Sequence, residues 1–367
     1  MDICNGTEVR KTFICRCIWM SFIVSEGTYL SHEMETMMEE NWKDWSLFIL
    51  KKLGVFILTL FVLSVLLFVL ERACPGDPLK AYYGGALERM SPVQKERARE
   101  SLGLNRPVAV QYVSWAKNVA KGDWGLSYKY KRPVKDVVGD YWTNTLALGG
   151  ISFFLLFVFS MWIGCWCALH ENSPGDRLLN RLGVAFSSIP GFFIAMLMLV
   201  IFASELRILP LGGVYSYGGG GFADRVQHLI LPVLTIVLGH TGYYGRLIRD
   251  RLTEETRKDY VIQKKASGMA PAVNLRRHCL KNARPQIIQI MALAAPHVLG
   301  GTYVAEMVFS YPGLGLLSFQ AAGDRDYNML MALTLITGVV ICAFNMIAEI
   351  VSARIDPRTR HGLEAAA

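Results

Sequence analysis

The chain has 367 residues, of which 52% are hydrophobic and 19% are charged, and its mean hydropathy is +0.31. The apolar residues gather in long charge-free runs that a water-soluble core could not use, which excludes a purely soluble protein. The formal net charge of +8 does not indicate nucleic-acid binding, because the basic residues flank the apolar runs and are not interleaved with aromatic residues.

The first 40 residues form an atypical N-terminal extension. Its apolar patch, Phe13–Val24, is interrupted by an arginine and is too short to cross a bilayer. A signal peptide, an interfacial helix and an upstream extension of the reading frame all fit this segment. Because Met34, Met37 or Met38 could each begin a chain with a normal first helix, we expect residues 1–40 to be dispensable.

Six later segments could cross a membrane. A bilayer core about 30 Å thick requires roughly 20 apolar helical residues. The first three segments carry no charge, although the third contains Pro190, whereas the last three contain or adjoin polar residues. The expected spans are Leu53–Leu70, Thr145–Leu169, Leu182–Ser204, Leu229–Gly245, Ile287–Phe309 and Met329–Ala348. The expected fold class is therefore an all-α integral membrane protein with six transmembrane helices.

The basic residues indicate the orientation of the spans. The loop between the fourth and fifth spans holds eleven Lys or Arg residues against four acidic ones, so the positive-inside rule places it in the cytoplasm. Six spans then put both termini inside. Residues 74–142, between the first two spans, are basic but too long for the rule, and we expect them to form a small extracytoplasmic domain.

The segment Asp259–Pro285 within this cytoplasmic loop is compact and basic. Gly268 can end one helical stretch and Pro271 can begin another, which predicts a helix–turn–helix lying on the membrane face. A basic loop between two spans often serves only as an orientation signal. We call this helix–turn–helix, Asp259–Pro285, the elbow. A soluble partner could dock on it and transmit movement to the membrane-spanning helices.

Two elements of this loop resemble a known family. Ala266 and Gly268 supply an Ala-x-Gly turn, and about ten residues later a second element reads His278, Leu280, Lys281, Asn282 and Ala283. The stretch resembles the cytoplasmic coupling loop of permeases in binding-protein-dependent ABC importers. Further motifs, in the order typical of the dipeptide, oligopeptide and nickel group, extend the resemblance over roughly Leu47–Arg360; they include Gly76-Asp77-Pro78, Leu209-Pro210, Pro312-Gly313-Leu314-Gly315 and Arg325-Asp326-Tyr327.

Two positions depart from the family pattern. Lys264 stands where the coupling loop usually has a small residue, and Asn328 stands where a proline commonly follows Arg-Asp-Tyr. The first departure concerns how closely a partner can pack against the loop.

The resemblance implies the first, larger-outer-loop permease of a pair in the bacterial inner membrane. It implies four partners besides the lipid bilayer: a second homologous permease, two ATPase subunits and an extracytoplasmic solute-binding protein. The residues expected to couple to the ATPases are Lys265, Ala266, Ser267, Gly268, His278, Leu280, Lys281 and Asn282. The chain has no Gly-Lys pair and hence no phosphate-binding P-loop, so we expect it not to be an enzyme; ATP and Mg²⁺ would bind to the partner subunits.

The apolar runs and the charge pattern, together with the resemblance, predict how the chain is organised. A first transmembrane helix lies within 41–73, the extracytoplasmic domain within 74–142 and a five-helix permease core within 143–353, which includes the coupling loop 250–285. The remainder, 354–367, would be a cytoplasmic tail, and its last residues, 363–367, resemble a cloning scar. Glycines that could let the helices pack closely are Gly239, Gly242, Gly245, Gly300 and Gly301.

Three ionisable residues within the spans, His240, His297 and Glu306, are candidates for the translocation pathway. They could equally hold helices together by hydrogen bonds. Two imidazoles could bind nickel or a metal chelate in passing, whereas the eight cysteines show no paired spacing typical of a resident metal or disulfide. We expect di- or oligopeptides as cargo, with nickel or a metal chelate as the alternative; a secondary transporter or a channel is a further alternative that lacks supporting motifs.

Overall fold

The computed structural model describes residues 45–73, 79, 83–101 and 103–355. The N-terminal extension 1–40 and the C-terminal segment 363–367 lie outside these residues. Contacts divide the chain into two units, residues 1–57 and 58–367, and the contacts that build the site lie in the second. The described residues are mostly helical and contain no β-strand, which confirms the all-α class.

Five helices in the described part are long and apolar enough to cross a membrane. They are Trp45–Ala73, α5 (Val134–Leu169), α8 (Phe222–Thr256), α12 (Arg284–Val308) and α14 (Tyr327–Ile355). A bent pair of helices could serve as a sixth span. Four of the six expected segments fall within single helices, Ile287–Phe309 ends one residue beyond α12, and Leu182–Ser204 is divided between the two arms of the bent pair.

The bent pair lies where the sequence predicted a single uninterrupted span, Leu182–Ser204. Helix α6 (Pro174–Ser188) and the segment formed by α7 (Gly191–Met198) and η2 (Leu199–Glu205) meet at 99°. Ile189, just before Pro190, adopts an extended conformation with ψ of 130°. Proline lacks an N–H and disfavours helical geometry in the preceding residue, so the helix ends at Ser188 and a new one begins in another direction.

The chain between the first helix and α5 forms η1 (Gly84–Arg89), α3 (Pro92–Ser101) and α4 (Val108–Ala120). Helix α5 begins directly after Pro133, inside the range expected for the extracytoplasmic domain. A short turn before it is fastened to the start of α14, where Ser127 donates a hydrogen bond of 2.5 Å to the buried carboxylate of Asp326.

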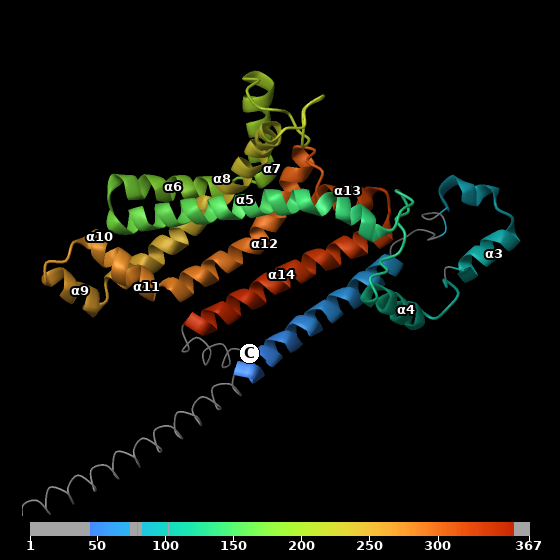
Figure 1. Cartoon of the computed structure of the whole chain (residues 1–367), viewed down its shortest axis with the longest axis horizontal. Coiled ribbons are helices and arrows are strands. Elements are labelled where there is room, and N and C mark those ends of the chain that lie inside the picture. The colour runs from blue at the N-terminus through green and yellow to red at the C-terminus, as the bar shows by residue number, and fades with distance from the viewer. Residues whose placement is uncertain (1–44, 74–78, 80–82, 102, 356–367) are drawn as a thin grey trace, which may run out of the picture. The chain divides into compact units, whose positions relative to one another are not determined.

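Helices α5, α8 and α12 supply most of the hydrophobic core, and α6 packs against α8 close to α5 (Figure 1). Gly183 of α6 and Gly242 of α8 meet backbone to backbone: a Cβ atom on Gly242 would lie 2.2 Å from the Gly183 Cα. A Cβ atom on Gly245 would lie 3.1 Å from the Ile163 Cγ2 atom of α5. Two of the predicted packing glycines therefore make tight helix contacts, whereas Gly300 has no neighbour within 4 Å.

Candidate coupling and translocation site

The predicted elbow follows α8 directly, and Figure 1 shows its helices gathered beyond the end of α8. Helix α9 (Asp259–Ala266) ends two residues before Gly268, whose φ of +85° is in the left-handed region. The Gly268 N–H donates to the Lys265 carbonyl and the Met269 N–H to the Lys264 carbonyl. This pair of bonds is a Schellman motif, which favours glycine at that position.

The second arm of the elbow begins at Pro271, as predicted. It comprises α10 (Pro271–Asn274), the π-helical turn η3 (Leu275–Cys279) and α11 (Leu280–Asn282). The Asn274 side chain donates a buried hydrogen bond of 3.1 Å to the Val261 carbonyl of α9, which holds the two arms together. Leu275 and Cys279 anchor this arm in the same hydrophobic core as α8.

The elbow is also fastened to the end of α8. Tyr260 donates a hydrogen bond of 2.6 Å to Glu255, and Lys258 forms an ion pair with the same carboxylate at 2.5 Å. Burial and this hydrogen bond raise the pKa of the Tyr260 hydroxyl above its ordinary value, which itself lies well above neutral pH, so the hydroxyl is protonated and can donate. A displacement of the elbow would therefore be passed to α8.

The predicted coupling residues divide into two groups. Six of them are exposed to solvent: Lys265, Ala266, Ser267, Gly268, Lys281 and Asn282. His278 and Leu280 are half-buried in the second arm and support the turn. The sequence reasoning missed Ile262 and Val273, which are 54% and 40% exposed on the two arms and supply an apolar surface. Their signal was weak because single exposed apolar residues are common on protein surfaces.

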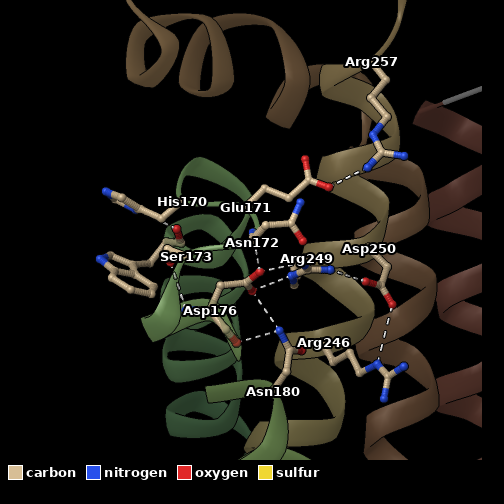
Figure 2. Close-up of polar contacts among 11 residues, drawn as sticks. His170, Glu171, Asn172, Ser173, Asp176, Asn180, Arg246, Arg249, Asp250 and Arg257 are labelled. Carbon is tan, nitrogen blue, oxygen red and sulfur yellow. Dashed lines mark hydrogen bonds and ion pairs between the residues drawn. The ribbon is translucent and has the colours of Figure 1, made fainter. Parts of the chain in front are cut away.

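A buried ion pair braces α8 against α6 (Figure 2). The Arg249 guanidinium donates from Nε and Nη2 to the two oxygens of Asp176, both at 2.7 Å. The same carboxylate accepts bonds from Asn180 Nδ2 at 2.8 Å and from the Asn172 N–H at 2.9 Å. Only 2% of the Asp176 side chain is exposed, so this bidentate pair is desolvated and fully satisfied.

A second ion pair, between Arg257 and Glu171, joins the end of α8 to the turn between α5 and α6. Sequence reasoning missed both pairs, because the partners are 73 and 86 residues apart. One local signal was present: Ser173, followed by Pro174 and then Asp176, predicts a capped helix start, and the Ser173 hydroxyl does accept the Asp176 N–H.

Two of the predicted pathway residues, His240 of α8 and His297 of α12, come together. Their ring centroids are 6.3 Å apart, with the planes 26° from parallel. The buried Tyr244 hydroxyl lies 2.5 Å from His297 Nδ1 and 3.1 Å from the Leu293 carbonyl. His297 itself is exposed on the surface of the chain.

The hydrogen bonds indicate where the imidazole protons lie. His240 Nδ1 contacts the Ile236 carbonyl, which can only accept, so this nitrogen carries the proton. The Tyr244 hydroxyl has a single proton and must donate it to the Leu293 carbonyl, which leaves His297 Nδ1–H to donate to the tyrosine oxygen. In the neutral rings both Nε2 atoms are then acceptors.

Glu306, the third predicted pathway residue, is fully buried and makes different contacts. It accepts hydrogen bonds from the Gly315 N–H at 2.6 Å, the Leu316 N–H at 3.2 Å and the Thr145 hydroxyl at 2.7 Å. The two N–H groups belong to the start of α13 (Leu314–Gly323), which the carboxylate caps. A Cβ atom on Gly313 would lie 2.3 Å from this carboxyl group, so the cap requires glycine there.

Replacing Glu306 by alanine should destabilise the protein by about 3 kcal/mol, because one buried and one part-buried N–H group lose their acceptor. We expect a lower melting temperature for the Glu306→Ala protein in detergent. Glu306→Gln retains one acceptor oxygen, so its melting temperature should lie between those of Glu306→Ala and the unaltered chain. Equal melting temperatures for Glu306→Ala and the unaltered chain would contradict the capping role.

Known proteins resemble the chain over most of its length. Residues 160–361 match the model of the family "Binding-protein-dependent transport system inner membrane component", and residues 46–149 match the N-terminal model of the same transport systems. The chain is 32% identical to the oligopeptide transport system permease protein AppB of Bacillus subtilis, over 86% of this chain and 99% of that protein. It is also 32% identical to the glutathione transport system permease protein GsiC of Escherichia coli, over 86% and 99% of the two chains.

A third relative is the metal-staphylopine import system permease protein CntB of Staphylococcus aureus, which is 29% identical over 86% of this chain and 98% of its own length. Among solved structures, the inward-facing MetNI methionine ABC transporter shares the fold, with a TM-score of 0.50 and 16% identity over 60% of this chain and 96% of the other. The chain belongs to the family of inner-membrane components of binding-protein-dependent transport systems.

Proposed function

We propose that this chain is the permease subunit of an ATP-driven importer that takes up short peptides delivered by an extracytoplasmic binding protein. The observation that carries the proposal is the exposed, glycine-dependent elbow fastened to the end of α8. The chain's relatives include permeases of oligopeptide and glutathione transport systems. The chain would lie in the bacterial inner membrane with both termini in the cytoplasm and residues 74–142 outside.

In this proposal two ATPase subunits dock on the elbow. Lys265–Gly268 would contact them directly, and the apolar surface of Ile262 and Val273 would be covered at the same time. Closure of the ATPases on ATP would move the elbow, and α8 would move with it as a rigid element because α5 and α6 brace it. Such rigid-body motion is what alternating access requires.

The wall of the pathway would be one side of α12. Gln289, Leu293, His297 and Gly300 recur at helical spacing, and all four residues are exposed or half-buried in this chain. Polar groups such as Gln289 and His297 would be costly against lipid, so this side fits a face turned towards the second permease and the water-filled passage. The two Nε2 acceptors beside it suit cargo that carries N–H donors, as peptides and their terminal ammonium groups do.

The function is tested by uptake into proteoliposomes that contain the chain and its co-purified partners. We expect accumulation of a tritiated tripeptide that requires both ATP and the binding protein. Accumulation without ATP, driven by a proton or sodium gradient, would contradict the proposal and favour a secondary transporter.

Metal-chelate import is the second candidate, because the two imidazoles and the similarity to a metal-staphylopine permease both favour it. Exchanging His297 for alanine separates the two. For peptides, loss of one hydrogen bond should slow uptake only about threefold. For a metal that uses the imidazole as a ligand, uptake should fall at least about tenfold, an effect that even the loss of an outer-shell group can produce.

Leu293→Ala, on the same side of α12 and 60% exposed, is the matched control. Uptake is measured with the tripeptide and with a radioactive nickel chelate. A tenfold loss of nickel uptake in His297→Ala, with no tripeptide uptake by the unaltered complex, would replace peptides by metal chelates as the cargo.

A further inference from the structure

A cavity of about 230 Å³ lies where the end of the first helix meets α4 and the start of α14. This volume is well above what one water molecule needs. Its walls include Glu71 and Arg72 from the first helix, Gln111 and Trp115 from α4, and Asn328 from α14. None of these side chains takes part in the coupling elbow or the histidine pair.

Three polar atoms beside this cavity are shielded from solvent and lack a hydrogen-bond partner among the described residues. They are Glu71 Oε2, Arg72 Nε and Gln111 Oε1. Burying such atoms without partners is unfavourable, so each would gain from a ligand that supplies one. Two of them accept hydrogen bonds and one donates, which calls for a ligand with both donor and acceptor groups.

The cavity is built on rigid supports. Phe68 is buried between Tyr112 and Trp115, with ring centroids at 5.5 and 5.7 Å, and the Arg72 guanidinium lies 5.2 Å from the Phe68 ring centroid. The Gln111 side-chain NH₂ donates to two backbone carbonyls of the preceding loop, which holds its Oε1 in place. Little side-chain entropy would be lost on binding.

One wall contains a position that departs from the family pattern. Asn328 stands where proline is common, and its Nδ2 donates a hydrogen bond of 3.0 Å to the Leu126 carbonyl. A Cβ atom on Gly125 would lie 3.1 Å from the same nitrogen, so the loop fits closely around the asparagine. Proline could make no such bond, which makes this side of the cavity particular to chains with an asparagine there.

We infer that this cavity binds a small zwitterion, with its ammonium group at Glu71 Oε2 and Gln111 Oε1 and its anionic group at Arg72. A simple anion would leave Glu71 Oε2 without a donor, and a simple cation would leave Arg72 Nε without an acceptor. Arg106, exposed at the mouth, adds a second positive charge for the anionic end.

Two kinds of molecule have this chemistry. One is a short peptide with free termini. The other is an ethanolamine phosphate headgroup, since Glu71 and Arg72 lie at the end of a 29-residue apolar helix, where a membrane surface would be. Both carry a primary ammonium that can donate hydrogen bonds, whereas phosphatidylcholine and an N-acetylated peptide do not.

The test uses the full-length chain in nanodiscs of phosphatidylglycerol, without ATP, so that its result is independent of transport. Four probes are compared: tritiated dialanine, N-acetyl-dialanine, dihexanoyl-phosphatidylethanolamine and dihexanoyl-phosphatidylcholine. We expect saturable binding and a raised melting temperature with dialanine, with the ethanolamine lipid, or with both. Binding of dialanine alone would identify the ligand as a peptide. Binding of the ethanolamine lipid alone would identify it as a lipid headgroup.

Glu71→Gln should weaken that binding at least about tenfold, because a charge-assisted hydrogen bond is lost. Glu88→Gln, an exposed carboxylate of η1, should bind like the unaltered chain. Ser114→Trp, at an exposed position on the rim, should abolish binding while the melting temperature without ligand stays unchanged. The inference is overturned by no saturable binding of either ammonium probe, by equal binding of the choline lipid, or by unchanged affinity in both Glu71→Gln and Ser114→Trp.

Discussion

Replacing Gly268 by arginine should reduce transport, and the ATP hydrolysis of the partner subunits, at least about tenfold. A left-handed conformation costs a residue with a Cβ atom about 1–2 kcal/mol, which lowers the population of the native turn about tenfold. No atom lies within 4 Å of the missing Cβ, so the chain itself has room for the side chain. The arginine would instead project into the space that we assign to the ATPase.

Two controls separate strain from lost docking. Gly122 has the same left-handed backbone, with φ of +83°, and no neighbour within 4 Å, but it lies far from the elbow in the chain. Gly122→Arg should therefore retain co-purification of the ATPase and its hydrolysis rate. Because asparagine tolerates the left-handed region, Gly268→Asn should lower transport and ATP hydrolysis less than about threefold. Normal co-purification and hydrolysis with Gly268→Arg would remove the elbow from the coupling mechanism.

The elbow could be predicted because its determinants are local. Gly268 and Pro271 act through their own backbone geometry, and both perform in the structure as the sequence indicated. Pro190 carried an equally local signal, but the uninterrupted apolar run around it favoured a single span. Hydropathy reports which residues avoid water and says little about the direction of a helix, so the 99° bend was missed.

The contacts that stiffen the core could not be predicted, since they join distant parts of the chain. Asp176 is an acidic residue in a turn that follows a hydrophobic run, and no neighbouring residue in the sequence indicates that its partner is Arg249. The pairing of His240 with His297 likewise depends on how α8 packs against α12. The sequence proposed these histidines as candidates, but their separation and their proton positions required the packed structure.

Together these contacts describe α8 as a lever. Its middle packs against α6 at Gly242 and against α5 at Gly245, its end is held by Arg249 and Arg257, and the elbow continues from it. A lever transmits movement only if its fixed points are stiff. The buried Asp176–Arg249 pair is the stiffest of these points, because both partners make two short bonds and the carboxylate is hidden from water.

Removing the Asp176 carboxylate should therefore have the largest effect on stability of any single change considered. Asp176→Ala leaves the Arg249 guanidinium, only 18% exposed, without its buried partner, a change that typically costs about 3–5 kcal/mol. We expect a strongly lowered melting temperature in detergent and little accumulation in membranes. Asp250→Asn removes the other carboxylate that Arg249 contacts, which is 51% exposed, and should cost less than about 1 kcal/mol.

The double variant tests whether the pair itself is responsible. Adding Arg249→Met to Asp176→Ala removes the uncompensated charge and should recover a large part of the lost stability, because an apolar side chain can replace a buried ion at little cost. The difference between the double variant and the sum of the single ones measures the interaction. If the stability losses of the single variants simply add, Asp176 stabilises the protein through its hydrogen bonds with Asn172 and Asn180. The ion pair with Arg249 would then not be what holds α8 in place.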